Sequence, residues 1–142
     1  MKIAIASDHA GYRYKSEIIN YLNSRNIETI DFGTDSDDAV DYPDYIRPAA
    51  LSVAEGTADL GIVLGGSGNG EAITANRVRG IRCAVCWSEQ TAAFAKQHNN
   101  ANVIAIGQRT ITLEVALTIV SVWLDSEFEA GRHLLRLQKI DA

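Results

Sequence analysis

A glycine-rich segment, Gly65–Glu71, combines groups that could stabilise a negative charge with one that could move a proton. It follows an apolar run over 60–64 that predicts a buried strand, and it precedes the predicted start of a helix. Its four glycines leave backbone N–H groups open to a ligand at a helix N-terminus, which is typical of an anion cradle. Donors for an oxyanion beside a carboxylate are the parts needed for enolisation next to a carbonyl.

The spacing of these glycines does not match two familiar phosphate-binding loops. After Gly65 they fall at positions 66, 68 and 70, which is not G-x-G-x-x-G, and no Lys-Ser or Lys-Thr pair follows as in a P-loop. A ligand-binding loop is the favoured interpretation. A turn that only redirects the chain is the alternative.

Strand-like and helix-like segments alternate along the chain. Short apolar runs predict strands over 3–7, 27–32, 60–64, 83–86 and 103–106. Helical patterns predict helices over 12–25, 45–55, 71–77, 89–97, 112–126 and 132–140. Five successive β–α units predict an α/β fold with a doubly wound, parallel five-stranded sheet between two helical layers, of Rossmann or flavodoxin type.

Ligands of such folds bind outside the carboxyl ends of the strands. The residues expected at those ends are Asp8 and His9, Asp41 and Tyr42, the segment 65–71, Trp87 and Ser88, and 107–109. Acidic groups, an aromatic ring, a glycine cradle and Arg109 should therefore converge on one rim of the sheet.

The bulk properties exclude several classes of protein. A chain of 142 residues fits a single domain over 1–142 with a real core. A net charge of −5 argues against nucleic acid as a partner. The apolar stretches near the start and over 115–124 are too short for a signal peptide or a membrane span. We expect a cytoplasmic protein with no membrane partner.

Two features could suggest metal or redox chemistry. Cys83 and Cys86 have C-x-x-C spacing, but they stand on a predicted strand, where residues three apart point to opposite faces. No second such pair is present, so buried thiols are favoured over a zinc site or a redox pair. The acidic stretch 35–38 lacks the Gly and Glu of a calcium loop and is interpreted as a solvated loop.

The predicted helix over 112–126 is apolar on nearly all sides. One face should cover the sheet, and the rest should lie exposed in a single chain, which favours a subunit interface and a homodimer. A helix buried within one domain is the alternative.

Basic and polar residues in the last third of the chain have two interpretations each. His98 and Asn99 follow a helix, so His98 is either a functional group or a C-terminal cap. Arg132 and Arg136 are four residues apart and share a helix face, so they form either a phosphate clamp or a solvated surface.

The motifs together resemble those of the type B ribose-5-phosphate isomerases, which are related to galactose-6-phosphate isomerase subunits. The similarity runs almost end to end and is carried by 7–11, 41–43, 64–71, 97–103 and 131–133. It implies a metal-free and cofactor-free aldose–ketose isomerase that interconverts ribose 5-phosphate and ribulose 5-phosphate through an enediolate.

The resemblance also implies roles for individual residues. One large branch of that family uses a cysteine base at the position of Gly65, so this chain is similar to the branch in which the base is a glutamate, here Glu71. Ser67 would orient Glu71 or bind substrate, and His98 would assist ring opening with Asp8 and Tyr42. The remaining substrate-binding residues would be His9, Gly66, Gly68, Asn69, Gly70, Asn99, Arg109, Arg132 and Arg136. The site would lie at a dimer interface, with His98, Asn99 and Arg109 supplied by the neighbour, in a dimer or a tetramer.

Two rival functions remain at this stage. An isomerase of allose 6-phosphate or galactose 6-phosphate would use the same groups, and only the depth of the pocket would distinguish it. A nucleotide-binding or signalling module could share the fold. A phosphoacceptor receiver needs an Asp at the end of the third strand, where this chain has Gly65.

Overall fold

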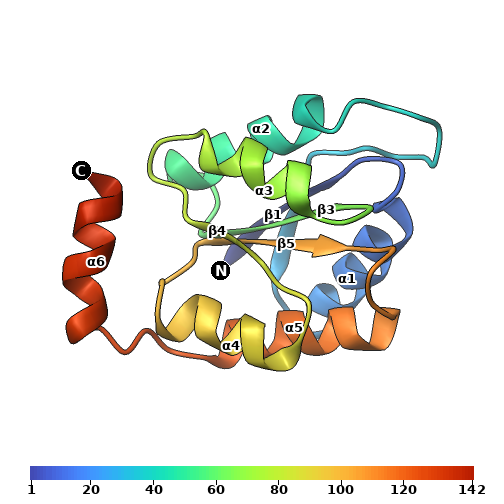
Figure 1. The fold of residues 1–142 in the computed structure, drawn as a ribbon. Coiled ribbons are helices and arrows are strands. Elements are labelled where there is room, and N and C mark those ends of the chain that lie inside the picture. Colours follow the sequence, from blue (N-terminus) through green and yellow to red (C-terminus); the bar gives the residue numbers. More distant parts are fainter.

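The computed structural model describes residues 1–142, and it confirms the predicted order of strands and helices (Figure 1). The strands are β1 (Lys2–Ser7), β2 (Glu28–Asp31), β3 (Leu60–Gly65), β4 (Cys83–Val85) and β5 (Val103–Gly107). The helices are α1 (Tyr12–Ser24), α2 (Pro43–Ala54), α3 (Asn69–Asn76), α4 (Glu89–Gln97), α5 (Leu113–Asp125) and α6 (Arg132–Asp141).

All five strands form one parallel sheet in the order β2-β1-β3-β5-β4. Helices α2 and α3 cover one face and α1, α4 and α5 cover the other, so the fold has three layers (Figure 1). The predicted doubly wound α/β architecture is therefore confirmed. Each face has its own apolar core, one built around Trp123 and the other around Ile46. α6 lies to one side of the sheet (Figure 1).

The direction of winding changes between β1 and β3. β1 leads to β2 on one side, whereas β3 lies on its other side, so the loops that leave β1 and β3 separate at this point. Such a switch point opens a crevice in doubly wound folds. Gly11 allows the two loops to meet, because a Cβ there would lie 2.7 Å from the backbone of Leu64. The fold thus brings the 8–11 loop against the start of the glycine-rich loop.

Two helices begin earlier than their sequence pattern predicts. α2 begins at Pro43 rather than at 45, because a proline suits the first position of a helix. α3 begins at Asn69 rather than at 71, directly after Gly68, whose φ of 83° turns the chain into the helix. The earlier start places Glu71 in the first turn of α3.

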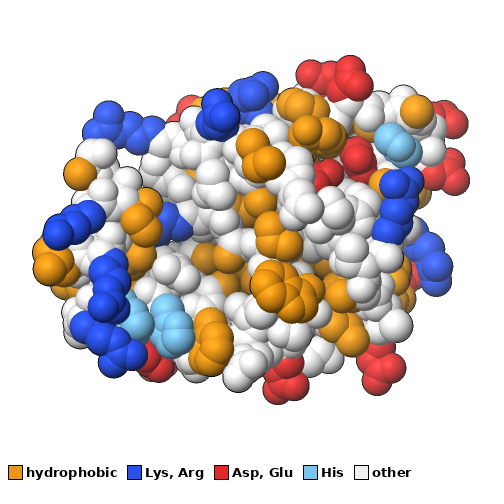
Figure 2. Space-filling view, viewed as in Figure 1, with side chains coloured by type: hydrophobic (Ala, Val, Ile, Leu, Met, Phe, Trp, Pro, Cys, Tyr) orange, Lys and Arg blue, Asp and Glu red, His pale blue; other side chains and the backbone are white.

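The expectation for the helix over 112–126 is wrong in one respect. Val120 and Trp123 are fully buried within the chain, and the other apolar side chains of α5 pack partly against the same core. The exposed apolar side chains lie elsewhere and include Ile73, Trp87 and Phe94. Figure 2 shows hydrophobic side chains in the middle of the face that carries α3 and α4. The sheet and α4 cover more of α5 than its sequence pattern indicates.

The two cysteines confirm the prediction of opposite faces. Cys86 belongs to the core on the α5 side, whereas Cys83 packs against the core on the α2 side, and both thiols are free. They therefore do not form a redox pair. None of the helices has the length and apolar character needed to cross a bilayer.

Candidate active site

The carboxylate of Glu71 lies directly over Gly65, at the carboxyl end of β3. A Cβ built on Gly65 would overlap with this carboxylate and would lie 2.7 Å from Oε2. Glu71 itself is only 3% exposed. The missing side chain at position 65 is thus what allows a carboxylate from the first turn of α3 to lie over the end of the strand.

The surroundings of Glu71 favour its protonated form. Burial raises the pKa of the carboxyl, the nearby Asp8 carboxylate raises it further, and the backbone N–H of Glu71 partly offsets the increase. A raised pKa makes a carboxylate a stronger base when it is ionised. Asp8 is also buried, and its Oδ1 accepts hydrogen bonds from the N–H groups of Ala10 and Gly11.

The rest of the glycine-rich loop is held tightly against β5. A Cβ on Gly107 would lie 2.6 Å from the backbone of Ser67, and the N–H groups of Gln108 and Arg109 donate to the carbonyls of Gly65 and Gly66. The Ser67 hydroxyl accepts a hydrogen bond from the N–H of Asn69 at 3.3 Å. The loop is therefore pre-organised, and its first helical N–H groups lie beside the buried carboxylate.

Two larger side chains lie against this loop. The ring of Tyr42 lies over Gly70, where an added Cβ would be 2.6 Å from Cζ. The guanidinium of Arg109 lies against Gly66, with Nη1 3.1 Å from the same kind of added Cβ. Arg109 thus packs on the glycine-rich loop of its own chain. Its supply by a neighbouring subunit stays a prediction.

His9 lies half-exposed at the same rim. Its Nδ1 accepts a hydrogen bond from the N–H of Val40 at 3.2 Å. In the neutral ring the proton is therefore on Nε2, which is free to donate to an anion.

A second group of predicted site residues lies near the amino ends of the strands, at the end of the sheet opposite to Glu71. His98 caps the C-terminus of α4, just before the amino end of β5, and Arg132 and Arg136 stand on α6. The His98 ring stacks between Phe94 and His133, with centroids 4.6 Å from each. Within one chain, α6 lies at the opposite end of the molecule from the loop that joins β3 to α3 (Figure 1).

Arg82 holds this second group together. Its side chain donates to the carbonyls of Asn99 and Asn100, and it forms an ion pair at 2.8 Å with Asp141 at the end of α6. One arginine therefore ties the loop that follows His98 to the helix that carries Arg132 and Arg136. Sequence reasoning missed Arg82, because its partners are distant in the chain.

A cavity of about 720 Å³ lies in this second region and not at Glu71. Its lining includes Arg82, Cys83, Asn99 and Ile140, between α6 and the segment that leads into β4. The residues predicted to complete the rim around Glu71 stand near the amino ends of the strands, on the side of this cavity.

Known proteins resemble this chain over nearly its whole length. The family model described as Ribose/Galactose Isomerase matches residues 3–140. The chain is 45% identical to ribose-5-phosphate isomerase B of Escherichia coli, over 99% of this chain and 95% of that protein.

Solved structures agree with this similarity. The Clostridium thermocellum ribose-5-phosphate isomerase B is 48% identical, with a TM-score of 0.98 over 99% of this chain and 95% of that one. The enzyme from Mycoplasma genitalium, solved with ribulose 5-phosphate bound, is 39% identical, with a TM-score of 0.95 over 99% and 93% of the two chains. The chain therefore belongs to the ribose/galactose isomerase family.

Proposed function

We propose that this protein is an aldose–ketose isomerase that interconverts ribose 5-phosphate and ribulose 5-phosphate, with Glu71 as the base. The observation that carries the proposal is the buried Glu71 carboxylate over Gly65, at the start of the helix that follows the glycine-rich loop. The names of relatives up to 47% identical support the reaction and the substrate. The whole chain, 1–142, would act as one sugar-phosphate isomerase domain, in the cytoplasm, where phosphorylated sugars are retained.

The proton transfer follows from the properties of Glu71. The carboxylate removes the proton from C2 of the open-chain aldose and returns it to C1 of the enediolate. The enediolate oxygen accepts hydrogen bonds from the N–H groups of 68–70, and one such donor contributes about 3–4 kcal/mol to a transition state. Asp8 raises the basicity of Glu71 by repulsion. Ser67 and Tyr42, which lie in and against the loop, would contact the sugar, and the reaction would need no metal or cofactor.

The phosphate and the ring-opening step require groups from both edges of the sheet. His9 and Arg109 lie at the rim with Glu71, whereas His98, Asn99, Arg132 and Arg136 lie at the other edge. In a homodimer, the amino ends of the strands of one chain would lie over the rim around Glu71 of the other chain, and this would complete two equal sites. Such a dimer could also be half of a tetramer. The exposed apolar residues Ile73, Trp87 and Phe94 favour such an interface.

Turnover of purified protein tests the assignment. Ketose formation is followed with ribose 5-phosphate, allose 6-phosphate and galactose 6-phosphate, for the wild type and for Glu71→Gln. The variant keeps size and polarity without basicity, so turnover should fall at least ~10²-fold while substrate still binds. Near-normal turnover would reject Glu71 as the base, and a preference for a hexose phosphate would reject the substrate.

A further inference from the structure

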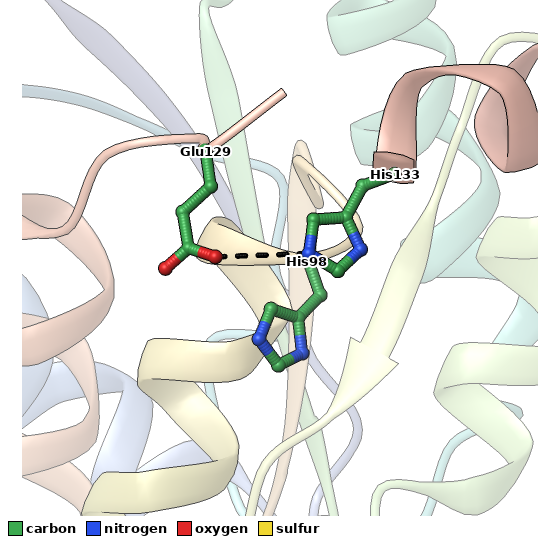
Figure 3. A group of neighbouring side chains, drawn as sticks. All are labelled: His98, Glu129 and His133. Atoms are coloured by element: carbon green, nitrogen blue, oxygen red, sulfur yellow. Dashed lines mark ion pairs between the residues drawn. The ribbon is translucent and has the colours of Figure 1, made fainter. Parts of the chain in front are cut away.

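Three side chains with metal-binding donors meet beside α6. Only one of them, His98, has a role in the proposed reaction. They are His98, Glu129 and His133, which we call the His–Glu cluster (Figure 3). Their donor atoms all lie within 4.8 Å of one another, and Oε1 of Glu129 is 3.6 Å from Nε2 of His133. Figure 3 shows the three side chains gathered in one place, with the ion pair between Glu129 and His133 and the ring of His98 next to that of His133.

The backbone holds these three side chains together. The N–H of Glu129 donates to the carbonyl of Gln97, next to His98, at 3.0 Å. Ala130 and Gly131 then turn the chain with φ values of 56° and 52°, which returns His133 to the same place. The N–H of His133 donates to the carbonyl of Ala130 at 2.9 Å. The end of α4 and the start of α6 are thus joined at the cluster.

The set of donors matches the requirements of zinc. Two imidazoles and one carboxylate are ligands that Zn²⁺ takes in three-residue sites, with a fourth position left to water. Zn–ligand distances near 2.0–2.1 Å place tetrahedral ligands roughly 3.3–3.5 Å apart. The pair of Glu129 and His133 already has nearly this separation. The rings of His98 and His133 are stacked with 18° between their planes, so His98 would need to turn out of this stack and approach by roughly 1–1.5 Å. Its half-exposed side chain leaves it room.

We propose that the His–Glu cluster is a Zn²⁺ site, and that occupancy of this site inhibits the enzyme. The side chain of His133 is 10% exposed and that of Glu129 is 52% exposed, so the metal would be anchored inside and open to water on one side. A His98 nitrogen that binds the metal cannot accept a proton from a sugar oxygen. The inhibitory role rests on the proposed function of His98, whereas the binding itself does not.

Binding is measured on the full-length protein after treatment with chelator. Titration with Zn²⁺ by calorimetry should give one saturable site per chain. Co²⁺ should give the visible absorption of a tetrahedral complex without the charge-transfer band of a thiolate, which distinguishes the cluster from Cys83 and Cys86. A thiolate band, or no saturable binding at millimolar metal, would overturn the site.

Two variants and a matched control locate the metal. Glu129→Gln and His133→Asn each remove one of three ligands and should weaken Zn²⁺ binding at least about tenfold. Glu127→Gln changes an exposed glutamate two residues away and should bind as the wild type does. Because Glu129 is exposed, its variant should fold even if the change at the better-buried His133 affects packing. Wild-type affinity in Glu129→Gln and His133→Asn would overturn the assignment.

The inhibitory role is tested with the same four proteins. Each is assayed with ribose 5-phosphate at increasing Zn²⁺, and its rate is divided by its own metal-free rate. The wild type and Glu127→Gln should be inhibited over the concentration range in which they bind Zn²⁺, and the two cluster variants should resist. Full activity of a Zn²⁺-loaded wild type would reject inhibition. A wild type with no isomerase activity at any metal level would reject the proposed function, while the binding data would still decide the site.

Discussion

Glu71 and Gly65 share one space: the carboxylate of the first lies where a side chain of the second would be. The family resemblance implies that the other branch carries a cysteine base at position 65 itself. Here the same end of β3 is reached from α3, six residues later in the chain. The two arrangements would place a proton-transferring group in the same part of the crevice, and they exclude each other in this chain.

The first prediction concerns this exclusion. Gly65→Ala should displace the Glu71 carboxylate, lower stability and reduce turnover, because the added Cβ overlaps with it. Gly65→Ala combined with Glu71→Ala should be more stable than Gly65→Ala alone, because the overlap is removed. A double-mutant cycle by denaturant unfolding should show a coupling of about 0.5–3 kcal/mol. Additive effects would show that the two positions do not compete.

The second prediction concerns pH and stability. The pKa of Glu71 is raised in the folded state above its ordinary value of 4.5. Between these two pKa values only the folded protein holds the proton, so the free energy of unfolding falls as the pH rises through this range. Glu71→Gln lacks this loss, so it should be more stable than the wild type at neutral pH, and the two should converge below the ordinary pKa. Thermal unfolding from acid to neutral pH measures the difference. A variant that is less stable at pH 7 would contradict the raised pKa.

The third prediction concerns phosphate binding by α6. Arg136→Ala should weaken binding of a phosphorylated sugar by ~1.5–3 kcal/mol, the contribution of a hydrogen bond between charged groups. Binding of the unphosphorylated sugar should barely change. Arg79→Ala, at another exposed arginine, is the matched control and should leave both affinities intact. Equal losses for the two ligands would indicate a structural role for Arg136.

The fourth prediction concerns the sharing of the site. Glu71 and His98 lie at opposite edges of the sheet in one chain, so a complete site would take one from each subunit. Glu71→Gln and His98→Asn should each be inactive alone and partly active after mixing and reassociation, because a mixed dimer contains one intact site. Each variant taken through the same procedure alone is the control. A wild-type protein that sediments as a monomer and is fully active would contradict a shared site.

The fifth prediction concerns the thiols. Burial raises the pKa of Cys86 to about 12 and that of Cys83 even further, so neither thiol is a nucleophile at neutral pH. Iodoacetamide should therefore leave turnover largely intact in the folded protein and should label both cysteines after denaturation. Rapid inactivation that substrate prevents would instead place a cysteine at the site.

Local patterns in the sequence determined much of this protein. The apolar runs and helical spacings predicted all eleven helices and strands in order, with most boundaries within two residues. The same patterns placed the glycine-rich loop between β3 and α3 and put the cysteines on opposite faces. These features follow from residues close together in the chain, whose spacing sets which side faces the core.

Only the tertiary structure decided how distant segments meet. The burial of α5 depends on helices from elsewhere in the chain, so its apolar pattern could not predict which of its side chains are exposed. The overlap of Glu71 with position 65 depends on where α3 begins, and the His–Glu cluster depends on a turn at 130–131. Periodicity within a segment carries no information on how strands pair. The parallel pairing of β3 with β5 puts Glu71, after β3, and His98, before β5, at opposite ends of the strands in one chain.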